Sequence, residues 1–248
     1  MEDAEYSRMA AVEDRHWWFR GRLAVVRTFL RRYVPPGVGL DVSCGTGLTL
    51  QALPQWVQMG ADLHTLALRA SATRGHKRLF QADLRHLPVG DSTLDVVTCL
   101  DTLEHIEQDT QALAEIFRAL KPGGCALLTV PAHPWMFSSH DRALHHVRRY
   151  RRGELKQRVL GAGLQIRKLR YINTALFPLI AAVRLISRDK GNASDTEKVP
   201  AGPLNWVLYQ TFALERLLLP WVPSLWGVSL LCVAQRPSGK PERETRTS

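Results

Sequence analysis

Short apolar runs alternate with longer amphipathic stretches along most of the chain. The apolar runs have the length of buried strands, and the stretches between them carry apolar residues at helical spacing. The pattern predicts strands at residues 38–42, 57–61, 77–82, 94–100, 125–130, 164–171 and 228–234. It predicts helices at residues 1–33, 48–56, 66–72, 108–120 and 153–160.

Repeated alternation of strand and helix with short connections predicts right-handed crossovers and a mostly parallel sheet. The run 126–130 is apolar almost throughout, which is typical of a strand buried on both faces. We therefore expect an α/β fold of the Rossmann-like, doubly wound type. Its centre would be a mostly parallel seven-stranded sheet with helices on both faces.

Composition limits the kind of protein. The chain has 248 residues, of which 45% are hydrophobic and 23% charged, so wholesale disorder and a collagen-like architecture are excluded. The four cysteines form no C-x-x-C pair, which argues against a zinc ribbon or a disulfide scaffold and predicts reduced thiols. No apolar core segment follows the acidic N-terminus, so we expect no secretory signal and a cytoplasmic location.

The chain is basic, with a formal net charge of +10. This balance favours anionic partners such as nucleic acid, a phospholipid surface or an acidic metabolite. Much of the charge lies in two clusters, at residues 148–152 and 167–170. Such clusters are more commonly solvated faces near helix ends.

A Gly-x-Gly turn at Gly45–Gly47 follows directly on the first predicted strand. Glycine lacks the Cβ that would hold a ligand away from the backbone, and the following helix start presents free N–H groups. The third glycine of a dinucleotide motif is missing, since Leu50 occupies its position, and no P-loop motif is present. Asp41 precedes the glycines, which favours a ligand with an amino group over one with phosphates. An ordinary strand–helix turn remains the alternative.

Acids also end the next two predicted strands. Asp62 ends the second strand, and Asp83, followed by Leu84, ends the third. Because the carboxyl ends of parallel strands meet at one edge, we expect Asp41, Asp62 and Asp83 to line a shared cleft. Asp62 would accept hydrogen bonds from ribose hydroxyls, and Asp83 lies where a nucleobase would be.

These features belong to a longer ordered series of motifs. The matching segments are 40–47, 60–63, 82–84, 87–88, 94–97, 103–105 and 113–124, and the last strand at 227–234 also fits. The series resembles class I S-adenosylmethionine-dependent methyltransferases of the broad group called type 11, in the family's order over residues 38–172. The resemblance implies S-adenosylmethionine as cofactor and transfer of its methyl group.

The resemblance also implies roles for individual residues. The start of the glycine turn would shape the methionine end of the cofactor, and the acids after the second and third strands would hold the ribose and flank the adenine. The end of the fourth strand would lie beneath the reacting methyl. The cofactor-binding residues implied are Asp41, Ser43, Gly45, Gly47, Asp62, Leu63, Asp83, Leu84, Leu100 and Asp101. Whether Leu63 or His64 packs on the ribose is left open. No metal site is predicted.

A general base is needed only if the methyl acceptor is a hydroxyl. His140 beside Asp141, in the loop after the fifth strand, could act as base and orienter. His105 follows the fourth strand and, in the family it resembles, faces the active site. Exposed or helix-capping histidines remain the alternative.

Four further residues are predicted to contact the acceptor. His133 and Trp135 belong to an aromatic loop that could form an apolar wall. Arg148 and Tyr150 precede a predicted helix, where the family carries a similar element. A structural role at a helix start remains open for both.

The chain divides into five predicted segments. Residues 1–36 would form an N-terminal helical lid, 37–172 the cofactor-binding methyltransferase core, 173–226 an apolar helical insertion or cap, 227–236 the final strand, and 237–248 a disordered tail. The apolar run at 174–187 is interrupted by Arg184 and is shorter than the ~20 residues of a spanning helix. The insertion could cap the substrate and contact lipid, at the inner face of a membrane, through Trp206, Trp221 and Trp226; a dimer contact would give the same pattern.

We therefore predict a methyltransferase acting on a small-molecule or lipid-like acceptor by in-line displacement. An RNA methyltransferase and a cofactor-binding regulatory subunit without catalysis are the alternatives. Nucleic acid is the less favoured partner, because no RNA-binding module is appended. The identity of the acceptor, the atom methylated and the oligomeric state stay open.

Overall fold

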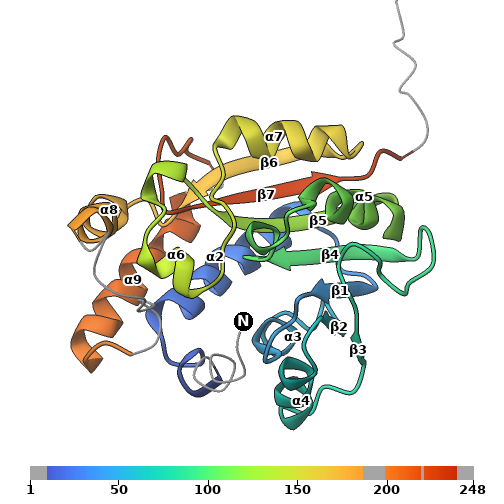
Figure 1. Ribbon diagram of the computed structural model, residues 1–248, viewed down its shortest axis with the longest axis horizontal. Coiled ribbons are helices and arrows are strands. Elements are labelled where there is room, and N and C mark those ends of the chain that lie inside the picture. Colours follow the sequence, from blue (N-terminus) through green and yellow to red (C-terminus); the bar gives the residue numbers. More distant parts are fainter. Residues whose placement is uncertain (1–9, 187–198, 219–220, 239–248) are drawn as a thin grey trace, which may run out of the picture.

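A computed structural model describes residues 10–186, 199–218 and 221–238 of the chain. Its centre is a seven-stranded sheet in the order β3-β2-β1-β4-β5-β7-β6 (Figure 1). Strands β1 to β5 are parallel, and β7 runs antiparallel to both of its neighbours. The strands are β1 Gly39–Val42, β2 Met59–Asp62, β3 Leu79–Gln81, β4 Leu94–Leu100, β5 Leu120–Pro131, β6 Gln165–Ile172 and β7 Ser229–Gln235. The predicted fold class is confirmed.

Helices cover both faces of this sheet (Figure 1). The helices are α2 Trp17–Tyr33, α3 Leu48–Ala52, α4 Thr65–Thr73, α5 Asp109–Ala119, α6 Ser139–Ala143, α7 Arg152–Gly161, α8 Phe177–Ile186 and α9 Gly202–Leu218. Two short 3₁₀ turns, η1 Leu103–His105 and η2 Pro134–Met136, follow β4 and β5. None of the described helices combines the length and the apolar composition needed to cross a membrane.

The central strands are buried on both faces, as their continuous apolar sequences predict. In β5, Ala126 and Leu128 pack into the core beneath α5 and α7, whereas Cys125 and Leu127 pack toward α2 and α3. This alternation follows from the two-residue period of a strand. The molecule therefore has two cores separated by one sheet.

Three elements differ from the sequence prediction by more than two residues. The helix predicted at 1–33 is interrupted, since α2 begins only at Trp17 after its N-cap His16. Helix α3 ends at Ala52 instead of residue 56, because Leu53 precedes Pro54 and a residue before proline is displaced from the helical region. Strand β5 begins at Leu120, which already pairs with Leu94 of β4. The register shift that follows accommodates Gly123, whose φ is +85°.

The predicted insertion contributes α9, which packs along α2. The backbone N–H of Trp17 donates a hydrogen bond to Asn205 at 2.9 Å. Gly21 lies directly under the ring of Phe212, where a Cβ would come within 2.4 Å of that ring. The close approach of the two helices therefore depends on glycine at position 21. The division into lid, core and cap stays a prediction, and residues 239–248 of the predicted tail lie outside the described residues.

Candidate functional site

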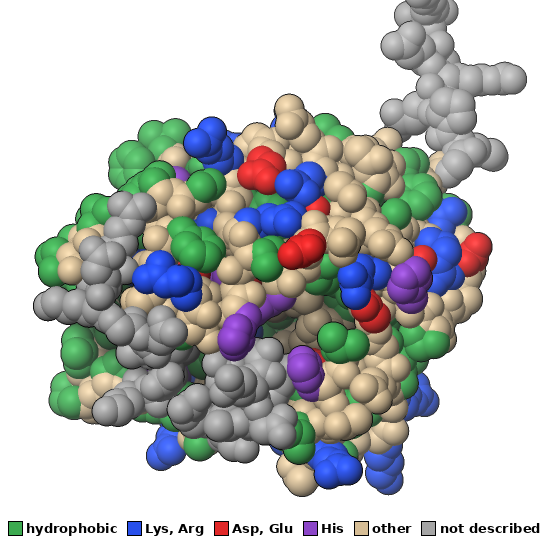
Figure 2. Space-filling model, in the orientation of Figure 1, with side chains coloured by type: hydrophobic (Ala, Val, Ile, Leu, Met, Phe, Trp, Pro, Cys, Tyr) green, Lys and Arg blue, Asp and Glu red, His purple; other side chains and the backbone are tan. Residues whose placement is uncertain are grey.

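A cavity of about 700 Å³ opens at the edge of the sheet where the parallel strands end. Its walls come from the segments that follow β1 to β4, from residues 13–22 and from the loop at 140–149. Figure 2 shows a hollow on this face with histidine side chains near it. The size suits a small-molecule site, and its place at the carboxyl ends of the strands is where open α/β sheets bind ligands.

Asp62 connects the glycine turn to the end of β2. Its Oδ2 accepts a hydrogen bond from the backbone N–H of Gly45 at 2.9 Å, and its Oδ1 accepts one from His64 N–H at 2.9 Å. Burial raises the pKa of the Asp62 carboxyl. Asp62, Gly45 and Ser43 all line the cavity, as does Leu63.

Asp41 and Gly47 lie behind the residues that line the cavity. The Asp41 carboxylate is buried under the sheet edge and accepts a hydrogen bond from the Thr98 hydroxyl at 2.5 Å. Burial raises the pKa of Asp41 to about 7. Gly47 has a φ of +88° and packs against α4, where a Cβ would lie 2.4 Å from the hydroxyl of Ser71. The residues that form the wall do not include either of them.

Asp83, at the end of β3, lines the cavity together with Leu84. The Arg85 guanidinium contacts its carboxylate at 2.5 Å and lowers the pKa of Asp83. Leu84 is buried and belongs to the core beneath the cavity floor. This end of the cavity therefore combines a charged pair with an apolar surface.

Asp101, at the end of β4, forms an ion pair with Arg22 of α2. The Thr129 hydroxyl donates a second hydrogen bond to Asp101 at 2.9 Å. Asp101 has a φ of +51° and Ser43, also at a strand end, has a φ of +60°. Left-handed backbone at non-glycine residues is uncommon and costly, and it concentrates at functional sites. Leu100 and Asp101 both line the cavity.

The N-terminal segment supplies a wall of the cavity. His16, Trp17, Trp18 and Phe19 line it from the start of α2. Glu13, one turn earlier, is buried; it accepts hydrogen bonds from the Thr46 hydroxyl in the glycine turn and from Arg74. Burial raises the pKa of Glu13. The described part of the predicted lid is thus fastened to the turn that it covers.

The histidine candidates for a base both line the cavity. Burial lowers the pKa of His105 to about 3, and it does the same to His140. Both rings are therefore neutral near pH 7. Asp141 holds His146: it contacts His146 Nδ1 at 3.0 Å and accepts a hydrogen bond from Arg149 Nε at 2.7 Å.

The four residues predicted to contact the acceptor lie outside the cavity wall. The chain turns outward at His133, which has a φ of +62°. His133 stacks on Tyr171 with ring centroids 5.2 Å apart, and Trp135 packs beside it at 5.6 Å. The backbone conformation at the end of β5 thus directs this loop toward β6, away from the site.

Arg148 and Tyr150 both serve the structure of the loop. Arg148 contacts the carboxylate of Asp109 at 2.9 Å. Tyr150 is fully buried, and its hydroxyl donates a hydrogen bond to the same carboxylate at 2.6 Å. The pair therefore fastens the segment before α7 to the start of α5.

Several residues of the cavity were not among the predicted site residues. Glu104 and His146 line it side by side although they are far apart in the sequence. Glu13 and Arg149 belong to the same surroundings. One indication of this group was present in the sequence, which was the acidic residue Glu104 next to His105. Side chains that come together from different loops leave no spacing pattern in the sequence.

Residues 40–128 match the family model described as a methyltransferase domain. The chain is 26% identical over 162 residues to a Mycolicibacterium smegmatis protein named a probable S-adenosylmethionine-dependent methyltransferase, covering 62% of this chain and 61% of that one. It is 34% identical over 106 residues to the ubiquinone biosynthesis O-methyltransferase of Psychrobacter arcticus, covering 38% of this chain and 41% of that one. The chain thus spans less than two thirds of the length of these relatives.

The fold is similar to that of a solved Thermotoga maritima S-adenosylmethionine-dependent methyltransferase, with a TM-score of 0.60 and 15% identity over 94% of this chain and 95% of that one. The chain carries a methyltransferase domain at residues 40–128. The match to the family model ends within β5. The loop at 140–149 and the helices α8 and α9 therefore lie outside the matched residues.

Proposed function

We propose that this protein binds S-adenosylmethionine in the cavity and transfers its methyl group to a small-molecule or lipid-like acceptor. The observation that carries the proposal is the row of carboxylates at successive strand ends, with Asp62, Asp83 and Asp101 all lining one cavity. The relatives named as methyltransferases support the same conclusion.

The residues of the cavity match the ribose, adenine and amino-acid groups of S-adenosylmethionine. The Asp62 carboxylate accepts two hydrogen bonds from backbone N–H groups and has further lone pairs. These lone pairs could accept hydrogen bonds from ribose hydroxyls. Asp83 and Leu84 provide a polar and an apolar contact for the adenine. Asp101 and Arg22 offer opposite charges to the ammonium and carboxylate groups of an amino acid.

The cofactor supplies an activated methyl group on a sulfonium. The protein has to hold acceptor and donor in line and keep water out, and such orientation contributes about 7–11 kcal/mol. The aromatic side chains Trp17, Trp18 and Phe19 shield the cavity on the α2 side. If the acceptor is a hydroxyl, His105 and His140 are the side chains at the cavity that could take up its proton: burial keeps both rings neutral, and the same lowering of their pKa to about 3 makes them weak bases.

A lipid-like acceptor is supported by the exposed apolar surface of α8, α9 and residues 221–226, which we call the apolar face. Its exposed side chains are Leu179, Val183, Leu185, Ile186, Leu204, Trp206, Val207, Leu214, Leu217, Leu218, Trp221, Val222, Leu225 and Trp226. In Figure 2, hydrophobic side chains gather on the side of the molecule where Figure 1 places α8. A surface with so many exposed apolar side chains marks an interaction site.

The charges around the apolar face favour an anionic phospholipid surface as its partner. Within the described residues of α8, α9 and 221–226, Glu215 is the only acid, and it is buried against Thr174. Arg216 is exposed on α9, and the Arg32 guanidinium lies 3.7 Å over the ring of Trp221. Tryptophan next to basic residues is typical of the interface between lipid and water.

Helix α8 links the apolar face to the cavity. Leu179 and Val183 are exposed, whereas Ile180 and Arg184 on the other side of the helix line the cavity. An acceptor leaving a membrane at this face would therefore reach the donor along one helix.

Transfer of labelled methyl from S-adenosylmethionine tests the proposed function. The protein is incubated separately with lipid extract, small-metabolite extract and total RNA, with Asp62→Ala as the inactive control. We expect label in lipid or small metabolites. Label in RNA alone would overturn the proposed acceptor, and no label despite measurable cofactor binding would support a regulatory subunit.

Flotation with vesicles tests the apolar face. We expect the protein to bind vesicles that contain anionic phospholipid and to bind neutral phosphatidylcholine vesicles weakly. The double variant Trp206→Ser, Trp221→Ser should lose binding, whereas Leu160→Ser, an exposed apolar residue on α7, should keep it. Equal binding by all three proteins would overturn the assignment of the face.

A further inference from the structure

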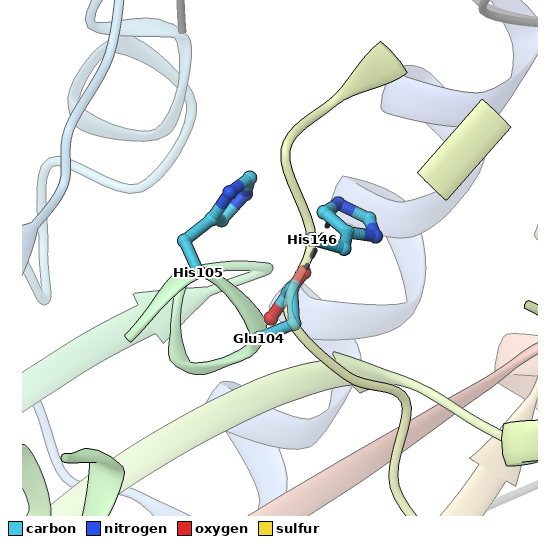
Figure 3. Close-up of side chains that lie close together, drawn as sticks. All are labelled: Glu104, His105 and His146. Atoms are coloured by element: carbon cyan, nitrogen blue, oxygen red, sulfur yellow. Dashed lines mark ion pairs between the residues drawn. The ribbon is translucent and has the colours of Figure 1, made fainter. Parts of the chain in front are cut away.

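Three potential metal ligands meet at one side of the cavity. Glu104 and His105 come from turn η1 after β4, and His146 comes from the loop after α6 (Figure 3). One ligand atom from each of the three lies within 4.8 Å of the others. All three residues line the cavity, so an ion among them would be in contact with its contents.

Glu104 is a fully buried carboxylate that lacks the usual compensation. Neither of its oxygens has a hydrogen-bond partner among the described residues. The neighbouring acids are paired with cations: Asp101 with Arg22, and Asp141 with Arg149. A buried charge without a partner is costly, so a cation is the group that would balance Glu104.

His146 presents a nitrogen to this carboxylate. Its Nδ1 contacts Asp141, which leaves Nε2 facing Glu104 Oε1 at 4.0 Å. Figure 3 shows the carboxylate of Glu104 directed at the imidazole of His146. Two metal–ligand bonds of about 2.1 Å at a tetrahedral angle place their ligand atoms about 3.4 Å apart. The three ligand atoms lie within 4.8 Å of one another, so binding one ion requires the side chains to draw closer together.

The surroundings of both histidines resemble those of metal ligands. A histidine that binds a metal usually donates its other ring N–H to a carboxylate or a backbone carbonyl. His146 has Asp141 in this place, and Asp141 is itself fixed by Arg149. The ring of His105 packs edge-on against the ring of His146, with centroids 4.7 Å apart. Both imidazoles are therefore restricted in orientation by their neighbours.

We propose that Glu104, His105 and His146 bind one divalent transition-metal ion whose open coordination positions face the cavity. Two imidazoles and one carboxylate are a ligand set that favours zinc or a neighbouring first-row metal over magnesium or calcium. The ion would accept an oxygen or nitrogen atom of a cavity ligand as a further ligand. Metal binding itself does not depend on methyl transfer.

Titration calorimetry with zinc chloride alone tests the site. The full-length protein is first stripped with a chelator, and magnesium chloride serves as the comparison ion. We expect one zinc ion per chain and no comparable heat from magnesium. Glu104→Gln and His146→Ala should abolish this binding, and Asp141→Asn should weaken it by about 10- to 100-fold, because it leaves the ligands in place but frees the ring of His146.

His64→Ala is the matched control, because His64 lines the same cavity outside the cluster and should leave zinc affinity unchanged. Thermal unfolding without zinc confirms that each variant is folded, and His105→Ala, at a less deeply buried ligand, provides a second variant if Glu104→Gln fails to fold. Absence of one-to-one binding, or wild-type affinity in His105→Ala and His146→Ala, would overturn the proposal.

The metal proposal and the proposed function can fail independently. Normal zinc binding by a protein that does not bind S-adenosylmethionine would remove the methyltransferase proposal alone. Cofactor binding and methyl transfer unaffected by zinc, with no zinc bound, would remove the metal site alone.

Discussion

Arg22 of α2 and Asp101 at the end of β4 form an ion pair inside the cavity, joining positions 79 residues apart in the sequence. The Thr129 hydroxyl fixes Asp101 from the neighbouring strand. The pair thereby connects the N-terminal segment to the sheet edge. A ligand that carries both an ammonium and a carboxylate group can replace each partner of the pair by one of its own charges.

Arg22→Met is expected to weaken binding of S-adenosylmethionine by about 10- to 100-fold, since a hydrogen bond to a charged group contributes about 1.5–3 kcal/mol. Binding of 5′-methylthioadenosine, which lacks the amino-acid part, should change little. Calorimetry with both ligands gives the comparison, and Arg20→Met on the outer side of α2 is the control. An equal loss for both ligands would show that Arg22 acts on the fold of the cavity instead of on the carboxylate.

Asp62→Ala is expected to abolish measurable binding of both ligands. The substitution removes the proposed hydrogen-bond acceptor for the ribose hydroxyls and also frees the backbone N–H of Gly45 that donates to Asp62. Asp91→Ala, an exposed acid whose described partner is Arg118, is the control and should bind both ligands normally. Affinity in Asp62→Ala equal to that of Asp91→Ala would contradict the assignment of the site.

Gly47→Ala and Gly75→Ala separate two costs of replacing a glycine. Both glycines have φ near +88°, but a Cβ at Gly75 would meet nothing within 4 Å, whereas one at Gly47 would clash with Ser71 and His76. Gly75→Ala should lower the free energy of unfolding by about 1 kcal/mol, the cost of left-handed backbone. Gly47→Ala should lower it by a further ~1–3 kcal/mol from overpacking. Urea unfolding of the two variants measures the difference, and equal losses would mean that the contact with α4 relaxes freely.

Asp41→Asn is expected to change how stability depends on pH. Burial raises the pKa of Asp41 from its ordinary 3.8 to about 7, so the folded protein keeps a proton that the unfolded chain releases near pH 4. The unfolded chain binds fewer protons in this window, so this group's contribution to stability falls as pH rises from about 4 to about 7 and is constant above. The fall amounts to about 4 kcal/mol for a shift of this size.

Urea unfolding at several pH values between 4 and 8 tests this expectation. The difference in free energy of unfolding between wild type and Asp41→Asn should follow the predicted fall, while Asp91→Asn, at an exposed acid, should run parallel to wild type. Parallel curves for wild type and Asp41→Asn would show that Asp41 titrates near its ordinary pKa.

Much of the fold was predictable because it depends on local patterns. The apolar runs marked all seven strands, and Gly45–Gly47 marked the turn after β1. The rule that parallel strands end on the same side predicted a shared cleft for Asp41, Asp62 and Asp83; Asp62 and Asp83 line the cavity, whereas Asp41 lies behind its wall. Asp101, which also lines the cavity, was implied by the family resemblance. Helix ends were less predictable, as α3 shows, because a single proline decided where it ended.

The direction of the loop after β5 was not predictable. The sequence predicted that His133 and Trp135 contact the acceptor, yet the positive φ of His133 turns the loop toward Tyr171. The Tyr150 hydroxyl donates a buried hydrogen bond to Asp109, and no spacing pattern in the sequence predicts this contact. Loop direction depends on single backbone dihedrals and on partners far along the chain.

Local sequence patterns specify which acids stand at strand ends, where glycine permits a tight turn, and that a parallel sheet brings these features to one edge. Contacts between distant segments specify that Arg22 reaches Asp101, that Asp41 and Gly47 lie behind the cavity wall, and that Glu104, His105 and His146 lie close together. Periodicity fixes which side of an element a residue occupies, whereas the meeting of side chains from separate loops is set by packing among elements that are remote in the chain.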